Sequence, residues 1–181
     1  MRLVYKSAGT QNNQMMENAI SLLDLAIKID SSYFTAYKNK FTFQTQLKQY
    51  ANAKLTAKQM VTLRPNDADY KKIMAGGAFE RAGDLSPATQ YYKSALVTYN
   101  RVLDTMSVTD KGYRSLEIGK AMNLILLNKE KEGRDLLKGL LAKETDPAYK
   151  LLFEEYMNFN KHDILYGKEH ITAENANPVK R

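Results

Sequence analysis

The sequence predicts an all-α fold, an α-solenoid of about four helix–turn–helix units that ends in a further helix. Three observations predict it. A pattern of small and aliphatic residues recurs about every 34 residues, segments with Pro, Gly and Asp separate the helix-like stretches, and no stretch shows sustained strand alternation with hairpin turn signals. Of the 181 residues, 44% are hydrophobic and 26% are charged, as in ordinary globular domains.

The recurring pattern begins at Ala19, Ala53 and Ala88, which lie 34 and 35 residues apart. After each alanine a larger residue or a second alanine follows four positions on, and Ala or Met follows seven positions on. This is the spacing of one helix face. A weaker copy begins at Gly133, 45 residues after Ala88. The additional residues amount to about three helical turns, and we expect them in an extended helix through Leu96–Met106.

A second set of helices is predicted between these segments, over 34–48, 68–82 and 113–128, each with apolar residues along one face. The segments between them contain helix start and stop signals. Asp67 is a candidate N-cap, and both Ser86-Pro87 and Asp146-Pro147 place a capping side chain before a proline at the first helical position.

These signals divide the chain into one helical-repeat domain, residues 1–171, and a flexible tail, residues 172–181. The domain contains repeats over approximately 1–33, 34–67, 68–110 and 113–145, followed by a C-terminal capping helix over 147–160. Because a single hairpin cannot bury its apolar face alone, we expect neighbouring repeats to stack.

The repeat resembles the tetratricopeptide repeat family over roughly residues 2–142. With Phe34 at repeat position 1, the family's characteristic positions are occupied by Tyr37, Ala53, Met60 and Pro65; in the next unit they are occupied by Gly76, Ala88, Tyr92 and Ala95. Phe41, Lys72 and Glu117 depart from the family pattern, so the register of the fourth repeat stays open. The resemblance implies a right-handed solenoid that is a non-catalytic scaffold and binds a peptide or a helix of another protein in its concave groove.

The resemblance also implies which residues line that groove. In the second unit they are Thr35, Lys38, Asn39, Thr42 and Gln46, and in the third unit Tyr70, Ile73, Gly77 and Arg81. A lysine beside an asparagine is suited to bind a carboxylate and a peptide backbone. The corresponding positions of the fourth unit are apolar, and we expect the C-terminal helix to cover them.

The composition argues against an enzyme and against a metal or cofactor site. Cys is absent and only two His are present, His162 and His170, whose spacing does not suit a shared metal ion. No signature of a nucleophilic triad is present. The Gly76-Gly77 pair lacks the Gly-Lys-Ser/Thr ending of a phosphate loop and is interpreted as a site of close helix packing.

The net charge of +7 leaves an alternative function open. Residues 1–60 contribute +5, from eight basic and three acidic residues, so this basic surface is suited to nucleic acid or another anionic partner. Lys outnumbers Arg by 20 to 7, which makes nucleic acid the less favoured partner. A third possibility is a tetratricopeptide-like fragment of a larger cell-envelope protein. The longest apolar runs are too short for a transmembrane segment, and neither compartment nor oligomeric state is determined.

Overall fold

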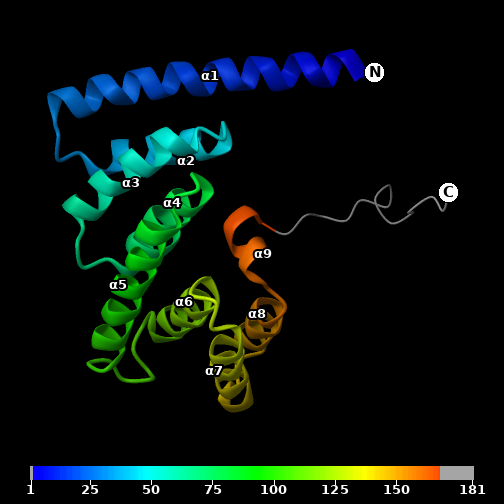
Figure 1. Cartoon of the computed structure of the whole chain (residues 1–181). Helices are drawn as coiled ribbons and strands as arrows, with labels where there is room; N and C mark the ends of the chain where they lie inside the picture. The colour runs from blue at the N-terminus through cyan, green and yellow to red at the C-terminus, as the bar shows by residue number, and fades with distance from the viewer. Residues whose placement is uncertain (1, 168–181) are drawn as a thin grey trace. The chain divides into compact units, whose positions relative to one another are not determined.

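A computed structural model describes residues 2–167 of the chain, with the backbone alone for residues 2–11, 70, 71 and 73 (Figure 1). Within these residues the regular structure is entirely helical, which confirms the all-α fold. The predicted tail and His170 lie outside the described residues. The helices are α1 (Arg2–Ile29), α2 (Phe34–Gln46), α3 (Tyr50–Leu63), the π-helix η1 (Tyr70–Gly76), α4 (Gly77–Arg81), α5 (Leu85–Leu103), α6 (Tyr113–Leu126), α7 (Glu130–Lys143), α8 (Pro147–Met157) and α9 (Lys161–Tyr166).

The helices belong to two compact units, residues 1–104 (unit 1) and residues 105–181 (unit 2), and each unit is described by itself. In unit 1, α1 packs on α2, α2 on α3, α3 on the continuous helix formed by η1 and α4, and that helix on α5. The core of unit 1 is built from one aromatic ring, Met and small residues, namely Phe41, Ala53, Ala57, Met60, Ala75 and Ala78.

The small residues of the repeat pattern lie where helices approach closely. Ala53 and Ala88 are buried in the first turns of α3 and α5. Gly76, at the end of η1, faces the ring of Tyr92 on α5, and a Cβ at Gly76 would lie 2.3 Å from the Tyr92 Cε1 atom. Close helix packing therefore accounts for Gly76, as its position in the repeat predicts.

The turns within three hairpins share one backbone geometry. Lys48, Gly83 and Asn128 each have a positive φ, between 58° and 86°. In each turn the next residue donates its N–H to a carbonyl five residues back, from Gln49 to Gln44, from Asp84 to Phe79 and from Lys129 to Leu124. This is the left-handed helix-ending motif that satisfies terminal carbonyl groups. The hairpins therefore repeat in their turns as well as in their sequence pattern.

The first predicted repeat differs from a hairpin. The sequence pattern predicts two helices within residues 1–33, but α1 is one helix of 28 residues. The stretch from Thr10 to Asn18 contains neither Gly nor Pro, so nothing in it interrupts the helix. A smaller correction concerns α5, which begins at Leu85 and so includes Ser86 in its first turn. The helix is extended to 19 residues, in the predicted direction, but it ends at Leu103 and not at the predicted Met106.

Unit 2 has a core of its own between α6, α7, α8 and α9. Phe153 of α8 is buried among Ile118, Ile125 and Leu137. The predicted Asp146 cap before a proline is confirmed at the start of α8, because the Asp146 carboxylate accepts a hydrogen bond from the Ala148 N–H, 2.9 Å away, and Pro147 occupies the first helical turn. The expectation that the C-terminal helix covers the apolar residues of the fourth unit is therefore correct.

Candidate functional site

The predicted groove residues of the second unit form a polar stripe along α2. Thr35, Lys38, Asn39, Thr42 and Gln46 are all exposed, whereas Ala36, Phe41 and Gln44 of the same helix are buried. Thr42 donates its hydroxyl hydrogen to the carbonyl oxygen of Lys38, 3.0 Å away. The stripe is therefore accessible to a partner, and its side chains are polar throughout.

The predicted residues of the third unit do not extend this stripe in the same way. Gly77 is buried and so presents no surface to a partner. Arg81 lies with its guanidinium carbon 6.0 Å from the centre of the Tyr50 ring, a cation–π contact that orients it. The side chains of Tyr70 and Ile73 lie outside the described residues.

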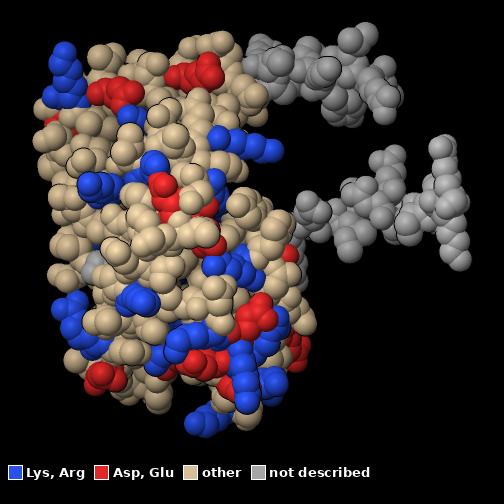
Figure 2. Space-filling model, viewed as in Figure 1, with Lys and Arg blue, Asp and Glu red and all other residues tan. Residues whose placement is uncertain are grey.

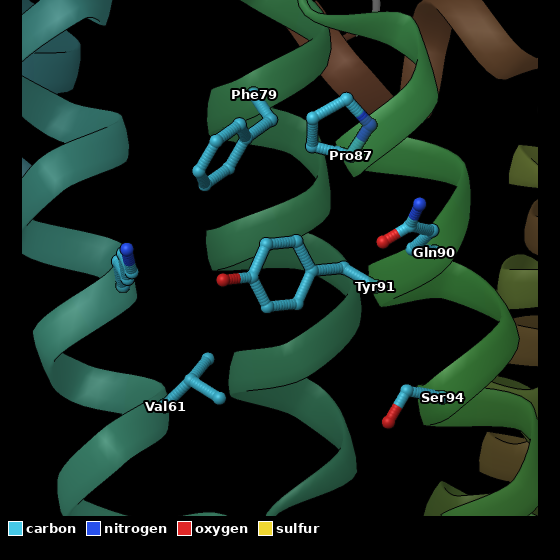
Figure 3. A pocket seen from close by; sticks show the side chains of 7 residues that line it. Val61, Phe79, Pro87, Gln90, Tyr91 and Ser94 are labelled. Atoms are coloured by element: carbon cyan, nitrogen blue, oxygen red, sulfur yellow. The ribbon is translucent and has the colours of Figure 1, made fainter.

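A pocket of about 560 Å³ opens elsewhere in unit 1, and none of the nine predicted groove residues lines it. Its walls come from α3, α4 and α5. Figure 3 shows the Phe79 and Tyr91 rings pointing toward the helix that carries Val61, while Pro87, Gln90 and Ser94 follow one another along α5. The lining residues are Lys58, Val61, Phe79, Pro87, Gln90, Tyr91 and Ser94.

The chemistry of this pocket combines rings with one cation. The Phe79 and Tyr91 rings lie 5.2 Å apart at an angle of 39° and form an aromatic wall. Burial raises the pKa of the Tyr91 hydroxyl above its ordinary value, so the hydroxyl stays protonated and can donate a hydrogen bond. Lys58 contributes an exposed ammonium group at the pocket. The pocket is therefore suited to an apolar side chain with a carboxylate beside it.

The repeat pattern does not predict this pocket, because the pocket is lined mostly by residues adjacent in sequence to those of the core. Tyr92 fits the repeat and is buried beneath Gly76, whereas its neighbour Tyr91 is turned by about 100° around the helix axis and reaches the pocket. The signal in the sequence is the Tyr91-Tyr92 pair, since only one of two adjacent helical residues can point into the same core.

The α2–α3 hairpin is strongly basic. Residues 31–66 contain Lys38, Lys40, Lys48, Lys54, Lys58 and Arg64 and no Asp or Glu. Lys40 forms an ion pair with Asp24 of α1, and Lys54 forms one with Asp84 at the start of α5. Lys38, Lys48 and Lys58 are exposed. On the face drawn in Figure 2, by contrast, basic and acidic side chains are mixed over α6, α7 and α8. The hairpin therefore presents positive charge to an anionic partner.

One charged cluster in unit 1 is part of the packing. Lys72 of η1 is 2% exposed, lies 3.3 Å from the Asp69 carboxylate and has its ammonium nitrogen 5.2 Å from the centre of the Tyr99 ring. The Tyr99 hydroxyl donates to the same carboxylate at 2.5 Å. Burial lowers the pKa of Lys72 and raises that of Tyr99. These contacts join η1 to α5, so we assign the cluster to packing.

The described part of the chain contains no group of three or more metal-ligating side chains. His162 is exposed, and its ring contacts that of Tyr166, with 4.9 Å between the ring centres. Among the described helices, none combines the length and the apolar composition needed to cross a bilayer.

Comparison of the chain with protein-family models, with curated proteins and with solved structures finds no match.

Proposed function

We propose that unit 1 is a non-catalytic protein-interaction module that binds an extended acidic segment of a partner protein. In this proposal an apolar side chain of the segment enters the pocket between α3 and α5, and a neighbouring carboxylate pairs with Lys58. The observation that carries the proposal is the position of the pocket: its apolar walls adjoin a hairpin with six basic residues and no acidic one. The tetratricopeptide-like repeat pattern supports the same class of function.

The composition of the pocket favours a peptide over nucleic acid. Affinity in protein interfaces comes from a few side chains seated in desolvated pockets, and Phe79, Val61 and Tyr91 provide such walls. Phosphate and base recognition relies on Arg forks, whereas all the basic residues of the hairpin except Arg64 are Lys. Arg64 lies with its guanidinium carbon 4.3 Å from the centre of the Phe34 ring.

The experiment is a peptide-display selection against the immobilised chain, followed by fluorescence polarisation with the selected peptides. We expect the selected peptides to share an aromatic or aliphatic residue next to Asp or Glu. The Lys58→Glu change is then expected to weaken binding about tenfold, because it replaces attraction with repulsion beside the pocket. Circular dichroism checks that the variant remains folded.

Lys38→Glu is the matched control, since it makes the same charge change on the same hairpin but outside the pocket. Binding that is lost with Lys38→Glu and Asn39→Asp but kept with Lys58→Glu would move the site to the α2 stripe. A labelled single-stranded oligonucleotide serves as the second probe. Oligonucleotide binding with a steep salt dependence and an equal loss in both lysine variants would replace the peptide proposal by nucleic-acid binding.

A further inference from the structure

Four large apolar side chains of α1 are exposed along one line of the helix. Met15, Leu22, Leu25 and Ile29 are 65%, 67%, 58% and 88% exposed. Single exposed apolar residues are common on proteins, but four large ones along one line of a helix indicate a contact surface. We call these four residues the α1 stripe.

The α1 stripe is distinct from the face by which α1 packs on α2. At about 100° per residue, the stripe residues cluster on one side of the helix, while the half-buried Ala19, Leu23 and Ala26 cluster about a quarter turn away. Polar residues occupy the remaining side, where Glu17, Ser21 and Asp24 are exposed. The helix thus has two apolar faces, and one of them is used within unit 1.

The length of α1 also exceeds that of its neighbour. It has 28 residues against 13 in α2, or about 42 Å against about 20 Å. Figure 1 shows α1 continuing toward the N-terminus past the end of α2. A helix without tertiary contacts is marginally stable in water, so a partner along α1 would stabilise this part of the helix.

The spacing of the α1 stripe favours another helix as that partner. Residues 15, 22 and 29 recur every seven positions, and residues 18 and 25 lie between them, which is the a/d spacing of a coiled coil. Upstream in the sequence the same spacing falls on Gln11, Ala8 and Val4, so Gln11 is a polar position on this line, as Asn18 is. An extended peptide would not require a seven-residue period.

We propose that α1 pairs with α1 of a second copy of this chain in a parallel two-stranded coiled coil. Parallel pairing in register places each stripe residue opposite its own copy and places Asn18 opposite Asn18, so that polar meets polar within the apolar seam. The flanking positions do not oppose this pairing. They hold Gln14, Ser21, Ala19 and Ala26, with Lys28 as the one charged residue among the flanking positions of residues 14–28.

This dimer does not depend on the proposed peptide site. The pocket is lined by α3, α4 and α5 and includes no residue of α1. A dimer would carry two such modules, and two linked sites would raise the apparent affinity for a partner with two acidic segments.

Sedimentation velocity of the wild-type chain tests the pairing directly, and we expect a dimer. The double change Leu22→Lys and Leu25→Lys is expected to convert it to a monomer in which the rest of unit 1 stays folded, since both side chains are already exposed within one copy. Helical content is expected to fall only by the part of α1 that extends past α2. The matched control is Val97→Lys, which charges a residue of α5 that is 68% exposed and leaves α1 intact. A wild-type monomer, or a Val97 variant that dissociates equally, would overturn the proposal.

Disulfide crosslinking tests the orientation, because the chain has no Cys of its own. Leu22→Cys and Leu25→Cys are each expected to form covalent dimers on mild oxidation, whereas Glu17→Cys on the polar side of α1 is not. Crosslinks that form between Met15→Cys and Ile29→Cys chains, but not between two copies of the same variant, would indicate antiparallel helices and overturn the parallel pairing. This readout is independent of the lysine variants and of peptide binding.

Discussion

The α2–α3 hairpin of unit 1 and the α6–α7 hairpin of unit 2 follow one plan but differ in how far they are covered. Each turns at a residue with positive φ, Lys48 or Asn128, and each has a small buried residue near the start of its second helix. Yet α2 buries three of its 13 residues, whereas α6 buries nine of its 14. Part of the α6 face is covered by α8 and α9. The hairpin motif thus predicts the fold, and the neighbouring helices decide which face remains available for binding.

The two hairpins also differ in whether their basic residues are paired within the hairpin. In α6–α7, Lys129 pairs with Glu132 at 2.9 Å and Arg134 pairs with Glu130 at 3.9 Å, both within the hairpin. The α2–α3 hairpin has no acidic residue with which to do this. A covered hairpin that pairs some of its charges internally is suited to a structural role, and an open hairpin with basic residues alone is suited to an acidic partner.

The largest expected effect comes from placing a charge in the packed face of the open hairpin. Ala53 is fully buried, so Ala53→Glu puts an unpaired carboxylate between helices and is expected to cost more than about 4–5 kcal/mol of the free energy of unfolding of unit 1. Ala88→Glu is expected to act alike. Circular dichroism and hydrogen exchange measure the loss. Ala51→Glu, on the exposed side of α3, is the control, and equal stability of the Ala51 and Ala53 variants would contradict the assigned face.

The next largest effect is expected from a change in the contact between α8 and the α6–α7 hairpin. Phe153 is 1% exposed in the unit 2 core, so Phe153→Ala is expected to lower the free energy of unfolding by about 3–5 kcal/mol. Hydrogen exchange should show the loss in α6, α7 and α8. Leu151→Ala removes an exposed side chain of the same helix and is expected to stay within about 0.5 kcal/mol. If the two variants have the same stability, α8 does not cover the hairpin as described.

The features that the sequence predicts are those set by residues close together along the chain. Asp146-Pro147 marks the start of α8 because capping involves adjacent residues, and the spacing of Ala53, Ala57 and Met60 identifies a buried helix face. The pocket was missed because it depends on which of two adjacent residues, Tyr91 or Tyr92, fills the core. That choice is made by the close approach of Gly76 on another helix.

The first repeat was predicted wrongly for a related reason. The spacing of Ala19, Leu23 and Ala26 fits a second repeat helix, and the family pattern then requires a first helix and a turn before it. The intervening residues contain no turn signal, and α1 continues through them. Repeat periodicity therefore identifies a helix face, whereas a turn needs evidence of its own.

Gly76 and Gly139 differ in their surroundings, since the first is closely packed and the second faces open space. A Cβ at Gly76 would collide with the Tyr92 ring, so Gly76→Ala is expected to destabilise unit 1 by about 1–3 kcal/mol. Gly139 of α7 has no atom within 4 Å of its added Cβ, so Gly139→Ala is expected to stabilise unit 2 by about 0.5–1 kcal/mol through helix propensity. Urea unfolding of both variants measures the difference in sign; two changes of the same sign would refute the comparison.

Unit 2 also contains an acid-sensitive contact between two of its elements. The Arg114 guanidinium donates to the Glu144 carboxylate at 2.5 and 3.1 Å, and the N–H groups of Asp146 and Thr145 donate to it at 3.0 and 2.9 Å. These bonds hold the pKa of Glu144 below its ordinary value.

Because that pKa is lowered on folding, the stabilisation is complete above the ordinary Glu pKa of about 4.3 and is lost as the pH falls through the lower folded value. Unfolding midpoints measured from about pH 7 to about pH 3 should therefore fall more steeply for the wild type than for Glu144→Gln. Parallel profiles would show that the contact does not contribute in solution.

The smallest expected effects come from the turns that the two hairpins share. Lys48 has a φ of 58°, where a Cβ is unfavourable, so Lys48→Gly is expected to stabilise unit 1 by about 0.5–1 kcal/mol. Asn128 has nearly the same φ, 60°, but Asn tolerates this conformation better than Lys, and its Oδ1 accepts a hydrogen bond from the Lys161 Nζ at 3.3 Å.

Asn128→Gly relieves the unfavourable positive φ but removes the hydrogen bond to Lys161. Its expected effect on the free energy of unfolding is therefore a few tenths of a kcal/mol at most. Urea midpoints of the two variants against the wild type measure the difference. A gain at Lys48 with none at Asn128 would show that the turns share a geometry while only the open hairpin retains strain in it. Lys48→Gly also removes one cation from the basic hairpin. Measuring its peptide affinity beside that of Lys58→Glu distinguishes the effect of this charge on binding from the effect of turn strain on stability.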